Sequence, residues 1–293
     1  MARPAAEWCA SHAALPTLEP AAAESRSIWL SVRDLQGRSR VAAGRLGLDG
    51  GKSRIELADA PALDLGDLGA FDDSGVTTSC VVTNRGRLYL YYTGWSRGVT
   101  VPFYLGAGLA VSDDGGHRFQ RVSRAPVLER SDLDPYLTAS PWVVRDGGAW
   151  RMWYVSATGW SKGPQGPRHH YHIRYAESAD LVTWRRTGHV CVDFAGPEEY
   201  AFGRPCVVHD PDGRYRMWYS VRGDTYRLGY AESGDGLSWT RRDDAIGLGL
   251  SPDGFDSQMM AYPAIFDRGG RRYMLYNGND YGRSGVGLAE ELP

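Results

Sequence analysis

Short apolar runs separated by turns rich in Gly, Asp and Pro recur along the whole chain. Residues 198–239 hold the clearest copy, with runs at Pro205 to Val208, Tyr215 to Tyr219 and Leu228 to Ala231, and a last turn that ends at Trp239. Apolar runs of about four to eight residues bounded by such turns are typical of half-buried antiparallel strands. One copy therefore predicts one four-stranded sheet.

The same pattern returns at a nearly constant spacing. Equivalent positions, which we call anchors, occur at Ser79, Ser140, Arg204 and Tyr262, which are 61, 64 and 58 residues apart. A weaker copy occupies the start of the chain, where Ile28 to Val32 matches the second run. Four strands in every period of about sixty residues indicate a propeller.

We therefore predict an all-β fold, a five-bladed β-propeller of four-stranded antiparallel blades in a single domain, 1–293. The expected blades are 10–60, 73–130, 134–194, 198–248 and 256–291. The last has only three runs, so we expect residues Arg3 to Cys9 to add its outer strand and close the ring, which would protect an exposed strand edge.

Composition narrows the classes of partner. The 293 residues carry a net charge of −2, with no basic cluster that would suggest nucleic acid and no apolar run long enough to span a membrane. Cys9, Cys80, Cys191 and Cys206 have no paired spacing, and the N-terminus has no secretory pattern. We expect reduced thiols and a cytoplasmic protein, and the oligomeric state stays open.

Acids recur six residues before each anchor, at Asp73, Asp134, Glu198 and Asp256. The loops that lead into innermost strands share one face of a propeller, so these carboxylates are expected to converge on its axis. A fold tolerates such repulsion mainly where a site needs it or a cation neutralises it. The alternative is that each acid only caps its local turn.

The loops between second and third strands reach the same face. We predict that this face binds substrate through aromatic, amide, imidazole and guanidinium groups. The predicted binding residues are Trp95, Trp160, Arg222, His170, His172 and Asn279, together with Asp256, Arg204 and Tyr262. Because adjacent strand residues alternate, His170 and His172 share a face while Tyr171 points away. Packing of the tryptophans between blades and ordinary polar roles for the histidines are the alternatives.

Several motifs resemble a known superfamily. The stretches FDDSGV, YYTGW, RMWYVS, YHIRYAES and GYAESGDG are similar to those of five-bladed glycoside hydrolases, the group of families 43, 32, 62 and 68. They most resemble bacterial glycosyl hydrolase-like proteins of polysaccharide or secondary-metabolite gene clusters. The resemblance implies a base, a pKa-tuning acid and a general acid, which would be Asp73, Asp134 and Glu198. The chain departs from the pattern because blade one has no acid.

We accordingly expect a carbohydrate-active enzyme that acts on a glycoside or activated sugar through carboxylate acid/base chemistry. No cofactor is expected, with a structural or pocket cation such as calcium as the open alternative. Two other functions stay open. One is non-hydrolytic acid/base catalysis such as transfer, elimination or cyclisation, and the other is noncatalytic sugar binding.

Overall fold

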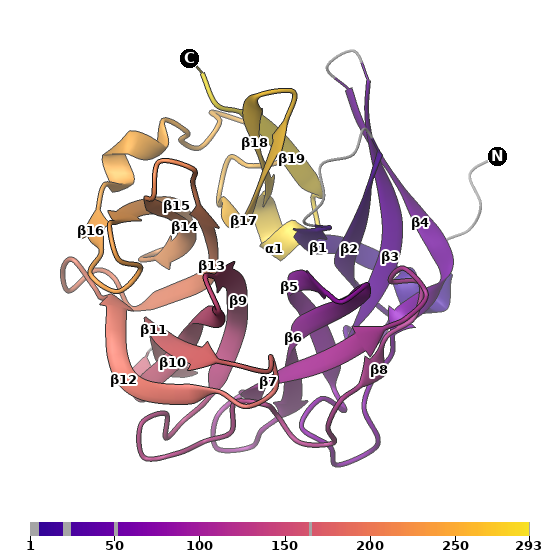
Figure 1. Cartoon of the computed structure of the whole chain (residues 1–293). Helices are drawn as coiled ribbons and strands as arrows, with labels where there is room; N and C mark the ends of the chain where they lie inside the picture. The colour runs from indigo at the N-terminus through magenta and orange to yellow at the C-terminus, as the bar shows by residue number, and fades with distance from the viewer. Residues whose placement is uncertain (1–5, 20–24, 50–51, 164–165, 293) are drawn as a thin grey trace.

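The computed structural model describes residues 6–19, 25–49, 52–163 and 166–292 (Figure 1). Its strands form five antiparallel groups that follow one another along the chain. The first contains β1 (Ser11–Leu18), β2 (Ser25–Arg33), β3 (Ser39–Asp49) and β4 (Lys52–Leu63). The second contains β5 (Gly75–Asn84), β6 (Arg87–Arg97), β7 (Phe103–Ser112) and β8 (Gln120–Arg121). One parallel pair, Ser39 with Gly75, joins these two groups.

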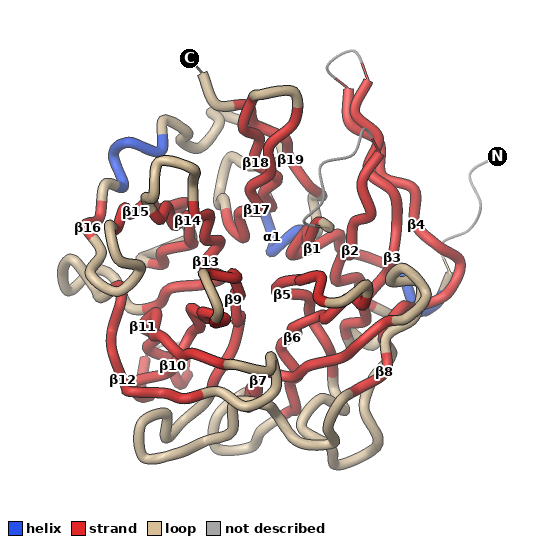
Figure 2. The backbone as a smooth tube through the Cα atoms, in the orientation of Figure 1, coloured by secondary structure: helices blue, strands red, loops and turns tan. Residues whose placement is uncertain are grey.

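The other groups stand as separate sheets. The third contains β9 (Thr138–Asp146), β10 (Ala149–Gly163), β11 (Gly166–Ser178) and β12 (Arg185–Val192). The fourth contains β13 (Ala201–His209), β14 (Tyr215–Arg222), β15 (Tyr226–Ser233) and β16 (Thr240–Arg241). The fifth contains β17 (Ala261–Arg268), β18 (Arg271–Asn277) and β19 (Val286–Glu290). The helices are short, namely η1 (Glu7–Cys9), η2 (Asp243–Ile246) and α1 (Asn279–Gly282), so the all-β prediction is confirmed (Figure 2).

The first strands of the five groups, β1, β5, β9, β13 and β17, lie nearest the centre of the molecule (Figure 1). Each contacts the next, and β17 contacts β1. Side chains of second strands reinforce these contacts by accepting backbone N–H groups of the neighbouring innermost strand. Asn277 Oδ1 accepts the N–H of Leu15 at 2.8 Å, and Ser31 Oγ accepts that of Thr78 at 2.9 Å. The first of these bonds joins the last group to the first.

The innermost strands are also bulged at one repeated place. Leu15, Ser140, Arg204 and Tyr262 all have positive φ, between 39° and 61°, and each is followed by proline. The strand register shifts at these points, which re-aims the backbone next to the central axis. Three of the four are anchors of the sequence repeat, so the anchor pattern marks a bulge.

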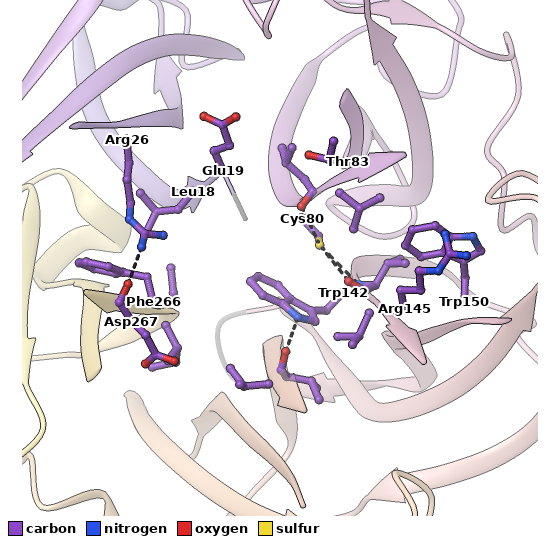
Figure 3. A pocket seen from close by; sticks show the side chains of 18 residues that line it. Leu18, Glu19, Arg26, Cys80, Thr83, Trp142, Arg145, Trp150, Phe266 and Asp267 are labelled. Carbon is purple, nitrogen blue, oxygen red and sulfur yellow. Dashed lines mark hydrogen bonds between the residues drawn. The ribbon is translucent and has the colours of Figure 1, made fainter. Parts of the chain in front are cut away.

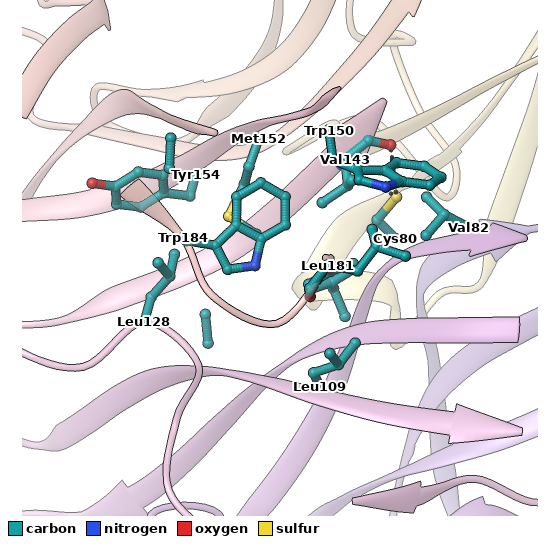
Figure 4. Packing of buried hydrophobic residues seen from close by; sticks show 13 residues of the cluster. Cys80, Val82, Leu109, Leu128, Val143, Trp150, Met152, Tyr154, Leu181 and Trp184 are labelled. Carbon is teal, nitrogen blue, oxygen red and sulfur yellow. Dashed lines mark hydrogen bonds between the residues drawn. The ribbon is translucent and has the colours of Figure 1, made fainter. Parts of the chain in front are cut away.

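Apolar side chains fill the spaces between neighbouring groups. One cluster joins the second and third groups and includes Trp184, whose ring meets Tyr91 edge to face at 5.9 Å (Figure 4). The turns before the last strands are part of this packing, because the Tyr91 hydroxyl donates to Leu181 O and the Trp153 indole N–H donates to Gly236 O. The turns that end at Trp184 and Trp239 thus pack against the preceding strand group.

The N-terminal segment differs from the prediction. Residues 1–5 lie outside the described part of the chain, and Glu7–Cys9 forms a 3₁₀ helix that contacts β2. Among the described residues, β19 pairs only with β18, so the described part of the predicted outer strand, Ala6 to Cys9, does not pair with it. No helix within the described ranges has the length and apolar character needed to cross a membrane.

Candidate functional site

A cavity of about 430 Å³ opens at one end of the central axis. Residues of all five strand groups line it, and seven aromatic side chains give it its character, so we call it the aromatic cavity. These are Trp95, Phe103, Tyr171, Phe202, Tyr226, Tyr262 and Tyr281. Small hydroxyl residues lie between them, among them Ser31, Ser140, Thr77 and Thr93. Flat rings with interspersed hydrogen-bonding groups are typical of small-molecule sites.

Two arginines complete the lining. Arg222 ends β14 and lies between the rings of Tyr200, Tyr226 and Tyr281, with its guanidinium carbon 5.5, 5.1 and 5.9 Å from their centroids. Arg33 ends β2 and also lines the cavity. Trp95 is fixed by its indole N–H, which donates to Ser39 Oγ at 2.9 Å. Three predicted binding residues, Arg222, Trp95 and Tyr262, thus lie together.

The histidine segment reaches the cavity with the face opposite to the one predicted. It is a regular extension of the β10–β11 hairpin, and His169 and Tyr171 line the cavity with their rings stacked at 4.2 Å. His170 bonds to Ser161 Oγ at 2.7 Å and His172 lies 3.2 Å from Asp193. His170 and His172 do share a face, but they do not line the cavity.

Burial gives His169 an unusual environment. Its Nε2 is buried without a hydrogen-bond partner among the described residues. Burial, and next the positive charge of Arg222, lower its pKa to about 4. Trp160 does not line the cavity but packs edge to face against His169 at 5.8 Å. The neutral imidazole therefore presents an unpaired nitrogen beside Arg222.

None of the four predicted acids lines the aromatic cavity. Asp134 is fully buried, where it accepts hydrogen bonds from the hydroxyls of Tyr154 and Ser156 and from the guanidinium of Arg186 at 2.8 Å. Asp256 is 4% exposed and accepts the Tyr276 hydroxyl at 2.9 Å. Neither lines the aromatic cavity. These hydrogen bonds give both carboxylates a structural role, and the assignment of Asp134 to catalysis and of Asp256 to substrate binding stays a prediction.

The other two acids lie outside the cavity lining as well. Asp73 is half-buried and accepts hydrogen bonds from Ser74 Oγ and the Gly69 N–H. Its neighbour Asp72 is the true counterpart of Asp134, because it is 1% exposed and accepts the Tyr92 hydroxyl. Glu198 is exposed and its side chain has no hydrogen bond or ion pair within the described residues. Its loop does meet the Arg222 turn, since the Tyr200 N–H donates to Arg222 O.

Two further predicted binding residues have structural roles. Arg204 is 1% exposed, and its guanidinium donates to Pro16 O, Thr17 Oγ1 and Ser79 O on other innermost strands. Asn279 holds a loop of the fifth group by accepting the N–H groups of Gln258 and Met259. Neither side chain lines the aromatic cavity.

The sequence did not single out several lining residues as binding residues, namely Tyr171, Tyr226, Tyr281 and His169. Arg33 was recognisable, since the sequence SVRD around it matches SVRG around Arg222. Tyr226 and Tyr281 follow second strands closely, and that position was the available signal. Their meeting around one guanidinium depends on loop geometry, which no run of residue types specifies.

A second cavity, of about 560 Å³, lies at the other ends of the innermost strands (Figure 3). Its walls are mainly valines and Trp142, whose indole N–H donates to Val207 O. Its charged residues have both signs, and Arg26 donates to the backbone oxygen of Asp267. Although larger, it offers fewer converging polar groups than the aromatic cavity.

Metal and redox chemistry find little support in the side chains described. No group of three or more His, Cys, Asp or Glu side chains within the described ranges is placed to hold a metal ion. All four cysteines are free thiols, and burial raises the pKa of Cys80 to about 12. Such a thiol is inert at neutral pH.

The chain resembles solved glycoside hydrolases in structure. A glycosyl hydrolase from Bacteroides ovatus matches with a TM-score of 0.72 and 16% identity, over 98% of this chain and 85% of that one. An endo-arabinase from Bacteroides thetaiotaomicron matches with a TM-score of 0.69 and 14% identity, over 96% of this chain and 95% of that one. A thermostable family-43 glycoside hydrolase gives 0.70 and 14%, over 96% and 89%. At these identities the likeness shows the fold.

No known family model matches the sequence. Two curated relatives are much closer in sequence, the uncharacterized proteins MT1551 and Rv1502 of Mycobacterium tuberculosis strains CDC 1551 and H37Rv. Each is 42% identical over 283 residues, which is 97% of this chain and 93% of the relative. This protein therefore belongs to the same family as Rv1502, built on the β-fold of the glycoside hydrolases.

Proposed function

We propose that this protein is carbohydrate-active, of the glycoside-hydrolase type, and that it binds a sugar in the aromatic cavity. The observation that carries the proposal is the meeting of Trp95 and four tyrosines with serine and threonine hydroxyls at one end of the axis. Aromatic rings bury the apolar faces of sugar rings, while hydroxyl and guanidinium groups bond to sugar hydroxyls. The fold shared with solved hydrolases adds support.

The architecture that we propose is a single domain of five blades arranged as a closed ring. The contact of β17 with β1 and the bond from Leu15 to Asn277 support closure between the last and first blades. Four free thiols support a reducing compartment, so the cytoplasm remains the proposed location. The proposed substrate is a glycan, a glycoside or an activated sugar.

Two chemistries are compatible with sugar binding. Hydrolysis of the usual kind needs two carboxyl groups about 5 to 10 Å apart across the glycosidic bond. Glu198 is the acid best placed to contribute, since its backbone oxygen lies beside Gly223, next to Arg222. The second candidate is sugar binding without hydrolysis. It is favoured because no Asp or Glu is among the described residues that line the cavity.

Sugar binding is tested first by calorimetry of the whole protein against a panel of defined oligosaccharides. Trp95→Ala is expected to weaken binding about tenfold or more, because a sugar-stacking ring is lost. Trp8→Ala is the matched control, since Trp8 lies in η1 away from the cavity. Equal affinities for the Trp95 variant and the unmodified protein would reject the cavity as the sugar site.

The reaction is tested on whichever oligosaccharide binds. Hydrolysis through Glu198 predicts that Glu198→Gln lowers product formation about a hundredfold or more while affinity is kept. The non-hydrolytic alternative predicts no released sugar from either protein, with binding intact in both. Chromatography of the incubated oligosaccharide separates the two.

A further inference from the structure

We infer that the sugar bound in the aromatic cavity is acidic and that Arg222 and Arg33 hold its carboxylate or phosphate group. The inference rests on the proposed sugar site and adds the chemical class of its ligand. It starts from the charges of the cavity. Two arginines and one histidine line it, and no acid among the described residues does.

Of the two arginines, Arg222 provides the stronger evidence for an anionic ligand. Its guanidinium is surrounded by three tyrosine rings and its Nε is buried without a hydrogen-bond partner. Aromatic faces stabilise a cation but leave its N–H donors unused. A buried charge is costly unless it is paired. The Arg222 guanidinium is therefore a cation in the cavity that lacks an anionic partner and can bind an anion.

Comparison with other arginines shows that this arrangement is unusual for the molecule. Partly buried arginines elsewhere are paired with carboxylates, as in Arg121 with Asp72, Arg186 with Asp134 and Arg241 with Glu199. Arg204, which has no carboxylate, is satisfied instead by backbone oxygens and Thr17. Within the part of the chain described, Arg222 has no carboxylate or backbone-oxygen partner; its side chain interacts with the Tyr226 hydroxyl, and its Nε is left unpaired.

Arg33 and His169 extend the positive surface across the cavity. The Arg33 side chain has no acid partner within the described ranges. Its positive charge adds to burial in lowering the pKa of His12, and it partly offsets the rise that burial causes in the pKa of Tyr262. His169 adds its unpaired Nε2 next to Arg222. The nearest acids of this end, Asp280 beside His12 and Glu198 beside Gly223, lie outside the lining.

The shape of these groups favours a planar or tetrahedral oxyanion on a sugar ring. A guanidinium donates two parallel hydrogen bonds to a carboxylate or phosphate, which gives orientation as well as affinity. The hydroxyls of Tyr171 and Tyr262 stay protonated because burial raises their pKa, so they can donate as well. Trp95 offers a face for the ring that carries the anion.

The test compares matched ligands by calorimetry at low salt. Galacturonate and glucuronate oligosaccharides are set against the galactose and glucose oligosaccharides, which differ only at the sixth carbon, and hexose 6-phosphates form a third arm. We expect an acidic sugar to bind about ten- to a hundredfold more tightly than its neutral partner, the range for charge-assisted hydrogen bonds.

Substitutions of the two arginines test whether they cause the preference for the acidic sugar. Arg222→Met keeps the side-chain length and packing but removes the charge, and it is expected to abolish the preference for the acidic sugar. Arg33→Met should reduce it. Arg214→Met is the control, because Arg214 lies in an exposed turn of the fourth group. Thermal unfolding of each variant checks that it is folded.

The outcomes distinguish the inference of an acidic ligand from the proposed sugar-binding function on which it rests. A preference for either uronate or sugar phosphate that is lost in the Arg222 variant supports the inference and identifies the anion. Equal binding of acidic and neutral sugars overturns the inference and leaves the sugar site standing. Binding of citrate or inorganic phosphate as tight as that of any acidic sugar also overturns it. Failure of every sugar to bind rejects the proposed function itself.

Discussion

Three buried acids in this protein pair with tyrosines of second strands. Tyr92 donates to Asp72, Tyr154 to Asp134 and Tyr276 to Asp256, each across 20 residues of sequence. In the fourth group the partner changes, since Tyr219 donates to Asp243. Glu198, at the repeat position of that group, is left exposed. Asp134 and Asp256 were visible in the sequence as repeated acids, and their tyrosine partners show how they help to stabilise the sheets.

Asp134→Asn is expected to destabilise the protein by about 3 kcal/mol, because Arg174 and Arg186 lose a shared buried partner. Urea unfolding measures the change. Glu198→Gln is the matched control and should stay within about 0.5 kcal/mol of the unmodified protein, as exposed positions usually do. A stable Asp134 variant that no longer binds sugar would show that Asp134 takes part in the binding site.

His169 makes stability depend on pH. Its folded pKa of about 4 lies below the ordinary value of 6.5, so the unfolded chain takes up the proton first as the solution is acidified. The contribution of neutral His169 is complete above pH 6.5 and is lost as the pH falls toward 4. The positive groups that act on it are Arg222, Arg168 and His170, while Tyr171 and Tyr200 flank its ring.

His169→Gln should therefore flatten the pH dependence by about 1 to 3 kcal/mol between pH 6.5 and 4. Chemical unfolding of both proteins at several pH values gives the difference. Other groups such as His12, whose pKa is also lowered to about 4, act equally in both proteins and cancel. Parallel curves would show that His169 titrates normally.

At the scale of elements, strand β11 shows what alternation can and cannot predict. The sequence correctly placed His170 and His172 on one face, because strand side chains alternate. Which face meets the cavity depends on how the hairpin packs on the neighbouring groups. In the structure His169 and Tyr171 line the cavity, whereas His170 bonds to Ser161 and His172 lies beside Asp193.

The innermost strands show a similar limit. The places of four of them were predictable from the anchors, since each of these four carries a short apolar run after an acid and a loop. The bulges were not predicted, although proline follows Leu15, Ser140, Arg204 and Tyr262. Bulges re-aim side chains near functional sites. Tyr262 lines the cavity, whereas Arg204, at the equivalent bulge, is buried and bonds to other innermost strands.

The turn that ends at Trp184 should be essential for the contact between the second and third groups. Trp184→Ala is expected to cost about 3 to 5 kcal/mol, because it leaves a void beside Tyr91, Leu128 and Met152. Trp184→Phe fills most of that space and should cost clearly less. Unfolding midpoints in urea compare the two, and equal losses would mean that the ring does not pack as described.

For the molecule as a whole, Arg204 connects the strand groups at the axis. It extends from β13 and donates to Pro16 and Thr17 of the first group and to Ser79 of the second. Its guanidinium also lies 6.0 Å from the Trp142 ring of the third group, and Tyr262 O of the fifth accepts a longer bond of 3.5 Å. One side chain thus contacts all the other groups.

Arg204→Met should consequently lower the free energy of unfolding by about 2 to 4 kcal/mol, since three backbone or hydroxyl acceptors lose their donor in a buried place. Differential scanning calorimetry and urea unfolding measure it. Arg214→Met, at an exposed turn, is the control. A loss below about 0.5 kcal/mol would show that the groups hold together without this arginine.

The period of about sixty residues made the overall architecture predictable, because every copy repeats the same strands and turns. The site was less predictable. Its residues come from different groups and meet only through the arrangement of those groups around the axis, as Arg33, Trp95 and Arg222 do. Repetition emphasised the acids, whereas Tyr171, Tyr226 and Tyr281, which also line the cavity, were not singled out by it.

The central claim is that an acidic sugar occupies the aromatic cavity, and a crystal structure with a bound hexuronate oligosaccharide tests it most directly. We predict a sugar ring against Trp95, with its carboxylate within hydrogen-bonding distance of Arg222 or Arg33. A sugar found instead in the cavity at the opposite end of the axis, near Trp142 and Arg26, would contradict the claim.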